Sequence, residues 1–168
     1  VESGSNGYVG GLIGYYYERN SGQSLGRLSA SGDVTGDGEY VGGLIGRAYS
    51  GRGSDLNQAA ATGTVRSTGD DVGGLVGRST NFRVSEAYAT GAVTGDTNVG
   101  GLVGYLNRGT VTDAYTAGNV TSDQYTGGFI GRHDGSIETS YWDTTEPTVT
   151  EAGTVVTEQA IGRDRGSG

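Results

Sequence analysis

A six-residue phrase of glycine and aliphatic residues recurs five times along this chain of 168 residues. The copies occupy residues 9–14, 41–46, 72–77, 99–104 and 126–131. Four read Val-Gly-Gly-Leu-Ile/Val-Gly, and the fifth reads Thr-Gly-Gly-Phe-Ile-Gly. They begin 32, 31, 27 and 27 residues apart. Recurrence at such a period is typical of repeat architectures, so we expect function to lie in a repeated surface rather than in one pocket.

Two further elements accompany each glycine phrase. A Gly-x-Val triplet occurs at residues 32–34, 63–65, 91–93 and 118–120, and an aliphatic residue stands four positions before a Ser, Ala or Tyr. These pairs are Leu25 and Ser29, Leu56 and Ala60, Val84 and Tyr88, Val111 and Tyr115, and Ile137 and Tyr141. Three short β-type segments separated by turn residues predict an all-β fold, a right-handed parallel β-solenoid (β-helix) of about five coils.

The solenoid interpretation makes specific predictions about the core and the repeat boundaries. Because alternate strand residues point inward, one internal ladder should contain Leu12, Leu44, Leu75, Leu102 and Phe129, and another Val34, Val65, Val93 and Val120. The predicted units lie near 1–31, 32–62, 63–90, 91–117 and 118–145, and residues 146–168 form a capping segment and tail. Val1 aligns with a position inside a repeat, so the first unit lacks its first strands. We therefore expect the segment to be part of a longer array, or its incomplete first coil to be completed by a neighbouring chain.

Composition restricts the classes of partner. Only 33% of residues are hydrophobic and 35 are glycine, which favours a thin repetitive core. All 11 basic residues are Arg, against 19 Asp and Glu, for a net charge of −8. Concentrated salt screens such a surface, so we favour a halophilic, archaeal source over an ordinary acidic surface protein. No basic stripe is available to neutralise phosphates, which disfavours nucleic acid.

Catalytic chemistry finds little support in the sequence. There is no Cys and only one His, His133, so neither a thiolate metal site nor a zinc site with two His ligands can form. We therefore expect no enzyme activity and no cofactor, although a carboxylate-and-Arg polysaccharide lyase or hydrolase remains an alternative. No apolar run is long enough to cross a membrane.

Candidate binding residues follow the glycine phrase. The residue directly after it is Tyr or Arg in every repeat, which predicts a strip of Tyr15, Arg47, Arg78, Tyr105 and Arg132. Cation–π stacking between rungs would make this strip either a stabilising stripe or a glycan- or partner-binding surface. The two longer repeats carry extra residues here, and we expect these insertions to form binding loops that include Tyr16, Tyr17, Tyr49 and Arg52.

An acidic residue also precedes each of the later glycine phrases. Asp37, Asp70, Asp96 and Asp123 would stack at one corner, where they are either solvated carboxylates or ligands of Ca²⁺. A glycosylation sequon begins at Asn119 and would be usable in a secreted protein.

The combined pattern resembles a known family. The phrase at 99–104, followed by Gly109-Thr110-Val111, Ala114-Tyr115, Gly118-x-Val120-Thr121 and the closing Ser140-Tyr141-Trp142-Asp143-Thr144, is similar to the GLUG repeat of bacterial and archaeal surface proteins. That family includes adhesin-like chains and non-catalytic regions of immunoglobulin A-cleaving metallopeptidases. The resemblance implies an extracellular structural or adhesive module of a cell-surface fibre, filament or stalk, which would contact further copies of itself, neighbouring domains or glycans. The alternative is a non-catalytic glycan- or partner-binding accessory region of a larger secreted enzyme or a viral surface fibre.

Overall fold

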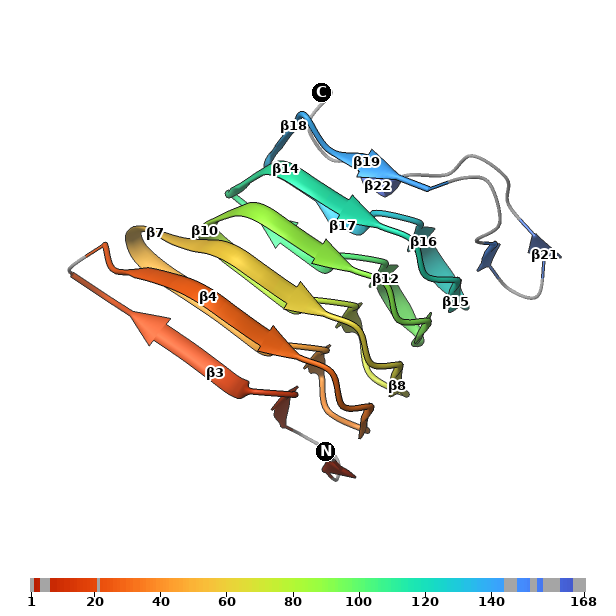
Figure 1. Cartoon of the computed structure of the whole chain (residues 1–168). Helices are drawn as coiled ribbons and strands as arrows, with labels where there is room; N and C mark the ends of the chain where they lie inside the picture. Colours follow the sequence, from red (N-terminus) through yellow and green to blue (C-terminus); the bar gives the residue numbers. More distant parts are fainter. Residues whose placement is uncertain are drawn as a thin grey trace.

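The computed structural model describes residues 2–3, 7–20, 22–143, 148–151, 154–155 and 161–164. In this part of the chain the backbone winds through about five coils of a parallel β-solenoid, with each coil stacked on the one before it (Figure 1). The described residues form no helix, so none is long and apolar enough to span a membrane. The predicted all-β parallel solenoid is confirmed.

Three sheets make up the walls of the solenoid. The seven-stranded sheet contains β1 (Glu2–Ser3), β5 (Val34–Gly36), β8 (Val65–Ser67), β11 (Val93–Thr94), β15 (Val120–Ser122), β20 (Val149–Glu151) and β21 (Thr154–Val155). The five-stranded sheet contains β2 (Tyr8–Gly10), β6 (Tyr40–Gly42), β9 (Asp71–Gly73), β12 (Thr97–Gly100) and β16 (Gln124–Gly127). Neighbouring strands pair in parallel throughout these two sheets, except that β20 and β21 are antiparallel.

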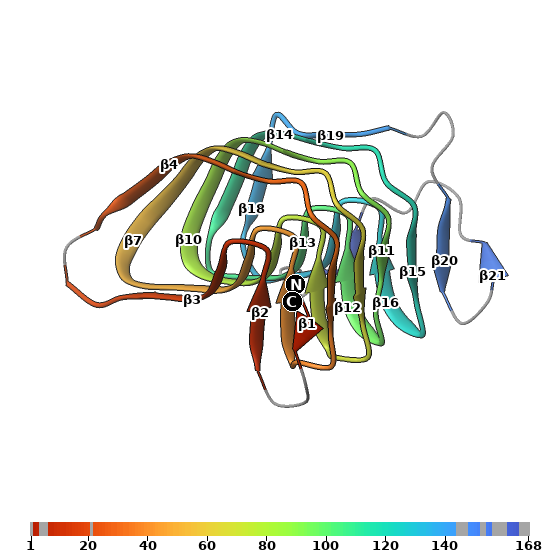
Figure 2. The same cartoon turned by 60° about the horizontal axis from the view of Figure 1, so that its bottom comes forward.

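The third sheet has ten strands and is bent, so each coil passes along it twice. It contains β3 (Ile13–Glu18), β4 (Ser24–Ala30), β7 (Ile45–Ala61), β10 (Val76–Ala89), β13 (Val103–Asn107), β14 (Thr110–Thr116), β17 (Ile130–His133), β18 (Ser136–Glu138), β19 (Tyr141–Trp142) and β22 (Ile161–Asp164). The long strands β7 and β10 follow the bend without interruption, whereas other coils divide the path between two or three strands (Figure 2). A coil thus has four straight segments rather than the three that the sequence suggested.

The glycine phrase forms the corner between the five-stranded and ten-stranded sheets. Its first two residues end one strand and its last two begin the next, as at β6 and β7. A Cβ atom at Gly42 would lie 2.0 Å from the carbonyl oxygen of Ile45 across the bend, and one at Gly43 would lie 2.1 Å from the carbonyl oxygen of Gly74 in the next coil. The first glycine therefore permits the tight bend, and the second permits close stacking of coils.

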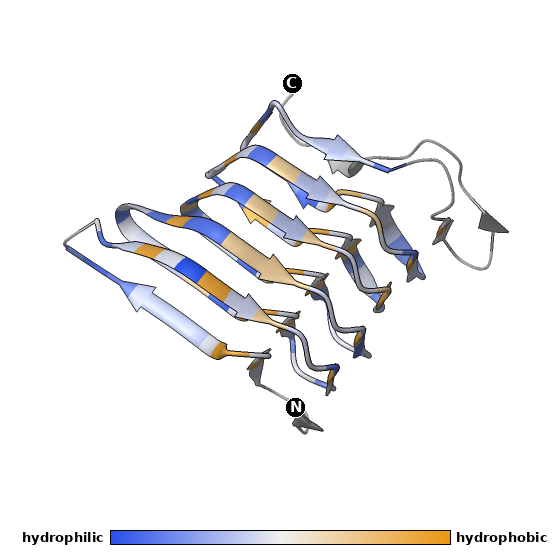
Figure 3. Cartoon of the chain, viewed as in Figure 1, coloured by the Kyte–Doolittle hydropathy of each residue, from blue (hydrophilic) through white to orange (hydrophobic). Residues whose placement is uncertain are grey.

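Two apolar ladders fill the interior. The larger contains Leu44, Leu75, Leu102 and Phe129, and the smaller consists of eight valines, among them the predicted Val34, Val65, Val93 and Val120. Along the strands of the bent sheet, apolar residues alternate with polar ones (Figure 3), as a wall with one inner and one outer face requires. Leu12 differs from its four counterparts because it lies on the first coil, where 53% of its surface is exposed.

The repeat pattern also continues beyond Trp142. Strand β20 pairs with β15, aligning Val149 with Val120, and β22 pairs with β17, aligning Ile161 with Ile130. The segment 146–168 thus adds rungs to two of the sheets, although most of its residues lie outside the described part of the chain. Its role as a cap, the handedness of the coil and the unit boundaries remain predictions.

Candidate functional site

The Tyr and Arg residues that follow the glycine phrase form one column on the outer face of the bent sheet. Strand register aligns Tyr15 with Arg47, Arg47 with Arg78, Arg78 with Tyr105, and Tyr105 with Arg132. Parallel pairing spaces successive members by about 4.8 Å. The five predicted strip residues are therefore consecutive neighbours.

A second column, across the glycine corner, packs against the first. It begins with Tyr8 and Tyr40, whose rings stack with centroids 5.4 Å apart, and continues with Asp71. The Arg47 guanidinium lies 5.1 Å from the Tyr40 ring centroid, within cation–π range. Tyr40 is only 8% exposed although it points away from the apolar core.

The same interlocking continues in later coils. The Tyr105 ring lies between two guanidinium groups, 4.7 Å from Arg78 and 4.4 Å from Arg132, and it is 6% exposed. Its hydroxyl donates a hydrogen bond to Asp134. Because the ring faces are covered by cations of the same chain, this column favours the stabilising interpretation over the binding one.

Asp71 is the buried anion of this corner. It pairs with Arg78 at 3.3 Å and accepts a 2.8 Å hydrogen bond from the Asn98 side chain. Burial nevertheless raises the pKa of Asp71 to about 6, since the Asn98 amide and the Arg78 charge offset its desolvation only in part. Burial also raises the pKa of Tyr40 to about 12, aided by a hydrogen bond to Glu39, and raises the pKa of Tyr105.

The predicted binding-loop residues lie mostly within strands. Tyr16, Tyr17 and Tyr49 belong to β3 and β7, and the Tyr17 and Tyr49 rings stack 5.2 Å apart on the outer face. Tyr16 instead points inward, where its ring meets Phe82 edge-on, so this half-buried residue packs against the core. Arg52 lies exposed at the bend of β7.

A buried polar cluster near this bend was not predicted. The Glu18 carboxylate accepts hydrogen bonds from the hydroxyls of Ser50 at 3.0 Å and Ser54 at 3.1 Å, and all three residues are buried. Charge-assisted hydrogen bonds of this kind compensate part of the desolvation of a buried carboxylate. The sequence carries no motif for the cluster, because its members come from different coils.

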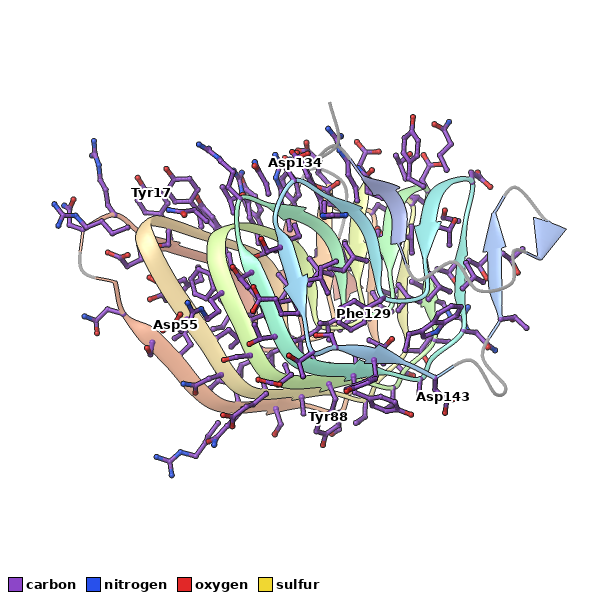
Figure 4. The ribbon with its side chains drawn as sticks, turned by 90° about the horizontal axis from the view of Figure 1, so that it is seen from above. Tyr17, Asp55, Tyr88, Phe129, Asp134 and Asp143 are labelled. Carbon is purple, nitrogen blue, oxygen red and sulfur yellow. The ribbon has the colours of Figure 1, made fainter. Side chains whose placement is uncertain are left out.

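The outer face of the second half of the bent sheet carries an exposed tyrosine row, which we define as Tyr88, Tyr115 and Tyr141. Strand register aligns these residues, and their exposed fractions are 45%, 39% and 67%. Figure 4 shows Tyr88 projecting from this face, on the side of the coil away from Tyr17 and Asp134. The recurring Ala-Tyr or Ser-Tyr pair was the available sequence signal for the row.

A hollow of about 380 Å³ adjoins the tyrosine row. Its floor includes the small residues Ala59 and Ala60, and Arg27, Gln58 and Glu86 lie around it beside Tyr88. Ala60 and Ser29 occupy, in the first two coils, the register position that Tyr88 holds in the third. The change from a large to a small side chain therefore creates a recess at the end of the row.

The four aspartates predicted as calcium ligands lie on the surface. Asp37, Asp70, Asp96 and Asp123 are all exposed, one in each of four successive coils. Among the described residues, no group of three or more His, Asp or Glu gathers closely enough to hold a metal ion. Calcium binding remains a prediction that would need additional ligands.

Asn119 and His133, the other two residues noted in the sequence, each contact a backbone atom. Asn119 is exposed, and its side-chain oxygen accepts a 2.8 Å hydrogen bond from the Thr148 amide in the next coil. A ring nitrogen of His133, Nδ1, lies 3.0 Å from the carbonyl oxygen of Gly135. Glycosylation of Asn119 remains a prediction.

Comparison with protein families matches residues 68–94 to the GLUG motif. No curated protein and no solved structure matches the chain. The matched stretch contains β9, one glycine phrase, β10 and β11, which together make one full coil. With the same phrase repeated in the other coils, this match supports the membership of the chain in the GLUG-repeat family.

Proposed function

We propose that this chain is an extracellular, non-catalytic module of a cell-surface fibre, filament or stalk, and that it combines a structural and an adhesive role. The in-register stack supports the structural part, since each coil presents the next with a matching edge and core. The acidic, Lys-free composition supports a halophilic source, in which salt screens the exposed Asp corner.

The tyrosine row is the observation that carries the adhesive part. Soluble proteins rarely expose large apolar groups in a contiguous series, and such surfaces mark interaction sites. Tyrosine suits adhesion because its ring supplies contact area while its hydroxyl forms hydrogen bonds. The row repeats along the solenoid axis, so a longer array would multiply weak contacts into avid attachment.

The experiment displays the chain on a non-adherent cell and measures attachment to glycan-coated and abiotic surfaces. The Tyr88→Ser and Tyr115→Ser double variant should lose at least about tenfold in attachment, since avidity depends on several simultaneous contacts. Ser occupies the same register position at Ser29, so the fold should tolerate the change. Tyr17→Ser with Tyr49→Ser is the matched control on the other outer face, because these two rings stack on each other outside the Tyr and Arg column. Equal attachment by wild type and the first variant would contradict the proposal.

A second candidate function is a glycan-binding accessory region of a larger secreted enzyme. It is favoured by one specific feature, an arginine-lined groove at the bend of the ten-stranded sheet. That groove shares no residue with the tyrosine row.

A further inference from the structure

A groove of about 510 Å³ lies where the ten-stranded sheet bends. Three of its lining residues are Arg52, Arg83 and Arg108, which come from three consecutive coils. The arginines were not predicted as a set because they stand at unequal spacings in the sequence. The bend brings them together, since it places β7, β10 and the β13–β14 connection side by side (Figure 2).

The guanidinium groups of the groove are largely available to a ligand. Arg83 approaches Asp55 at 3.9 Å, but both side chains are about half exposed, and such pairs contribute little stability. Within the described part of the chain, no ion pair engages Arg52 or Arg108. The other carboxylate of the groove, Asp134, already accepts the Tyr105 hydroxyl.

The groove departs from the charge of the rest of the molecule. The chain carries a net charge of −8, whereas the groove holds three arginines and two aspartates. The four exposed aspartates predicted as calcium ligands lie elsewhere, in the turns between the seven-stranded and five-stranded sheets. A groove with local positive charge on an acidic protein attracts an anion while the remaining surface repels one.

Hydroxyl groups accompany the arginines. Thr110 and Ser136 line the groove in register on adjacent coils, and Thr110 is also aligned with Arg83. A ligand lying along the solenoid axis would therefore meet a guanidinium or a hydroxyl at each step of about 4.8 Å. Guanidinium groups bind carboxylates through paired hydrogen bonds.

We propose that this groove binds a carboxylated saccharide chain of the uronic-acid class. Arg52, Arg83 and Arg108 pair with sugar carboxylates, while Thr110, Ser136 and Asp55 bond to ring hydroxyls. Asp55 and Asp134 repel a ligand as densely charged as nucleic acid, and Asp55 can also accept hydrogen bonds from sugar hydroxyls. This site is separate from the tyrosine row, so it does not depend on the proposed adhesive function. It rests on the second candidate function, glycan binding, and names the ligand class for it.

The test titrates the whole chain with an oligogalacturonate by calorimetry in low salt, and then with the same oligosaccharide after its carboxyl groups are reduced to alcohols. We expect the acidic form to bind and the neutral form to bind at least about tenfold more weakly, a loss equivalent to one charge-assisted contact. The Arg52→Gln and Arg108→Asn double variant should weaken acidic-oligosaccharide binding at least about tenfold. Asn is compatible with the left-handed backbone at Arg108, because Asn81 adopts the same conformation one coil earlier.

The matched control is the Arg27→Gln and Arg66→Gln double variant, which removes the same charge from exposed positions outside the groove. Gln suits the left-handed backbone at Arg27, as Gln58 adopts it in the next coil. The control should bind like wild type. Equal loss in both variants, equal binding of the neutral oligosaccharide, or no binding in low salt would overturn the proposal. So would self-association that the groove variant abolishes, since the occupant would then be a second copy.

Discussion

Two stretches of the ten-stranded sheet carry outward-facing tyrosines, but one stretch buries the side chain and the other exposes it. In one coil, Tyr105 on β13 is 6% exposed, whereas Tyr115 on β14 is 39% exposed. Tyr105 lies beside the glycine corner, where the guanidinium groups of Arg78 and Arg132 cover its ring. Tyr115 stands on an outer face with no sheet opposite it. The geometry of the outer surface, rather than the residue type, separates a stabilising column from one available to partners.

Substitution of a glycine at the glycine corner should lower the free energy of unfolding more than any other change considered. In Gly74→Ala the new Cβ would lie 2.1 Å from the Gly101 carbonyl oxygen, a backbone atom that cannot move without separating the coils. We expect a loss of about 3 kcal/mol or more in the free energy of unfolding, at the upper end for overpacking. Urea denaturation monitored by circular dichroism would measure it.

Gly32→Ala is the control, since a Cβ there would meet nothing within 4 Å. It should change the free energy of unfolding by less than about 0.5 kcal/mol, as is usual for open surface sites. Similar losses in both variants would mean that glycine is needed for turn conformation alone and that close stacking of coils is not the constraint.

The two tyrosines themselves provide the second test. Tyr105→Ala removes a ring held between Arg78 and Arg132 and leaves Asp134 without its hydroxyl partner. Two cation–π contacts and a lost hydrogen bond together predict a cost of about 2 to 3 kcal/mol. Tyr115→Ala should cost less than about 0.5 kcal/mol.

Chemical denaturation of both variants would measure the difference. Tyr105→Phe refines the result, because it keeps the ring between the guanidinium groups and should retain more than half of the stability that Tyr105→Ala loses. Equal costs for Tyr105→Ala and Tyr115→Ala would remove the distinction between the packed column and the exposed row.

Much of the fold could be predicted because its constraint is local and repeated. The glycine phrase and the Gly-x-Val triplet mark the same positions in each coil, and the predicted Val ladder is fully buried. The Tyr and Arg strip could be aligned for the same reason. Ile161-Gly162-Arg163 repeats the end of the phrase at residues 130–132, so the continuation through β22 also had a signal.

Other features have no local signature. One residue per coil adopts a left-handed backbone in the second half of the bent sheet, namely Arg27, Gln58, Glu86, Asp113 and Thr139. Only Asp113 belongs to the residue types, Gly, Asn and Asp, that usually indicate this conformation. The arginine groove and the Glu18 cluster likewise depend on which insertions the bend brings together. Packing between coils decides both, and a single repeat does not encode it.

Asp71 provides the finest test of how closed the glycine corner is. Its pKa is raised to about 6 in the folded protein, against an ordinary value of 3.8, because burial disfavours the ionised carboxylate. Between about pH 4 and pH 6 the folded state therefore keeps a proton that the unfolded state has lost. The contribution of Asp71 to stability is largest below that window and falls by about 3 kcal/mol as the pH rises through it.

Asp71→Asn removes this titration while retaining a side chain of the same shape, and Asn98 already occupies the equivalent position one coil later. Relative to wild type, the variant should gain about 3 kcal/mol between pH 4 and pH 7, in unfolding free energies measured across that range. Its absolute stability at neutral pH should change little, since the lost Arg78 pairing offsets the relief of burying a charge. Asp70→Asn, at the exposed neighbouring position, is the charge-matched control. A stability difference between Asp71→Asn and wild type that does not vary with pH would mean that water reaches Asp71 and that the glycine corner is as open as the tyrosine row.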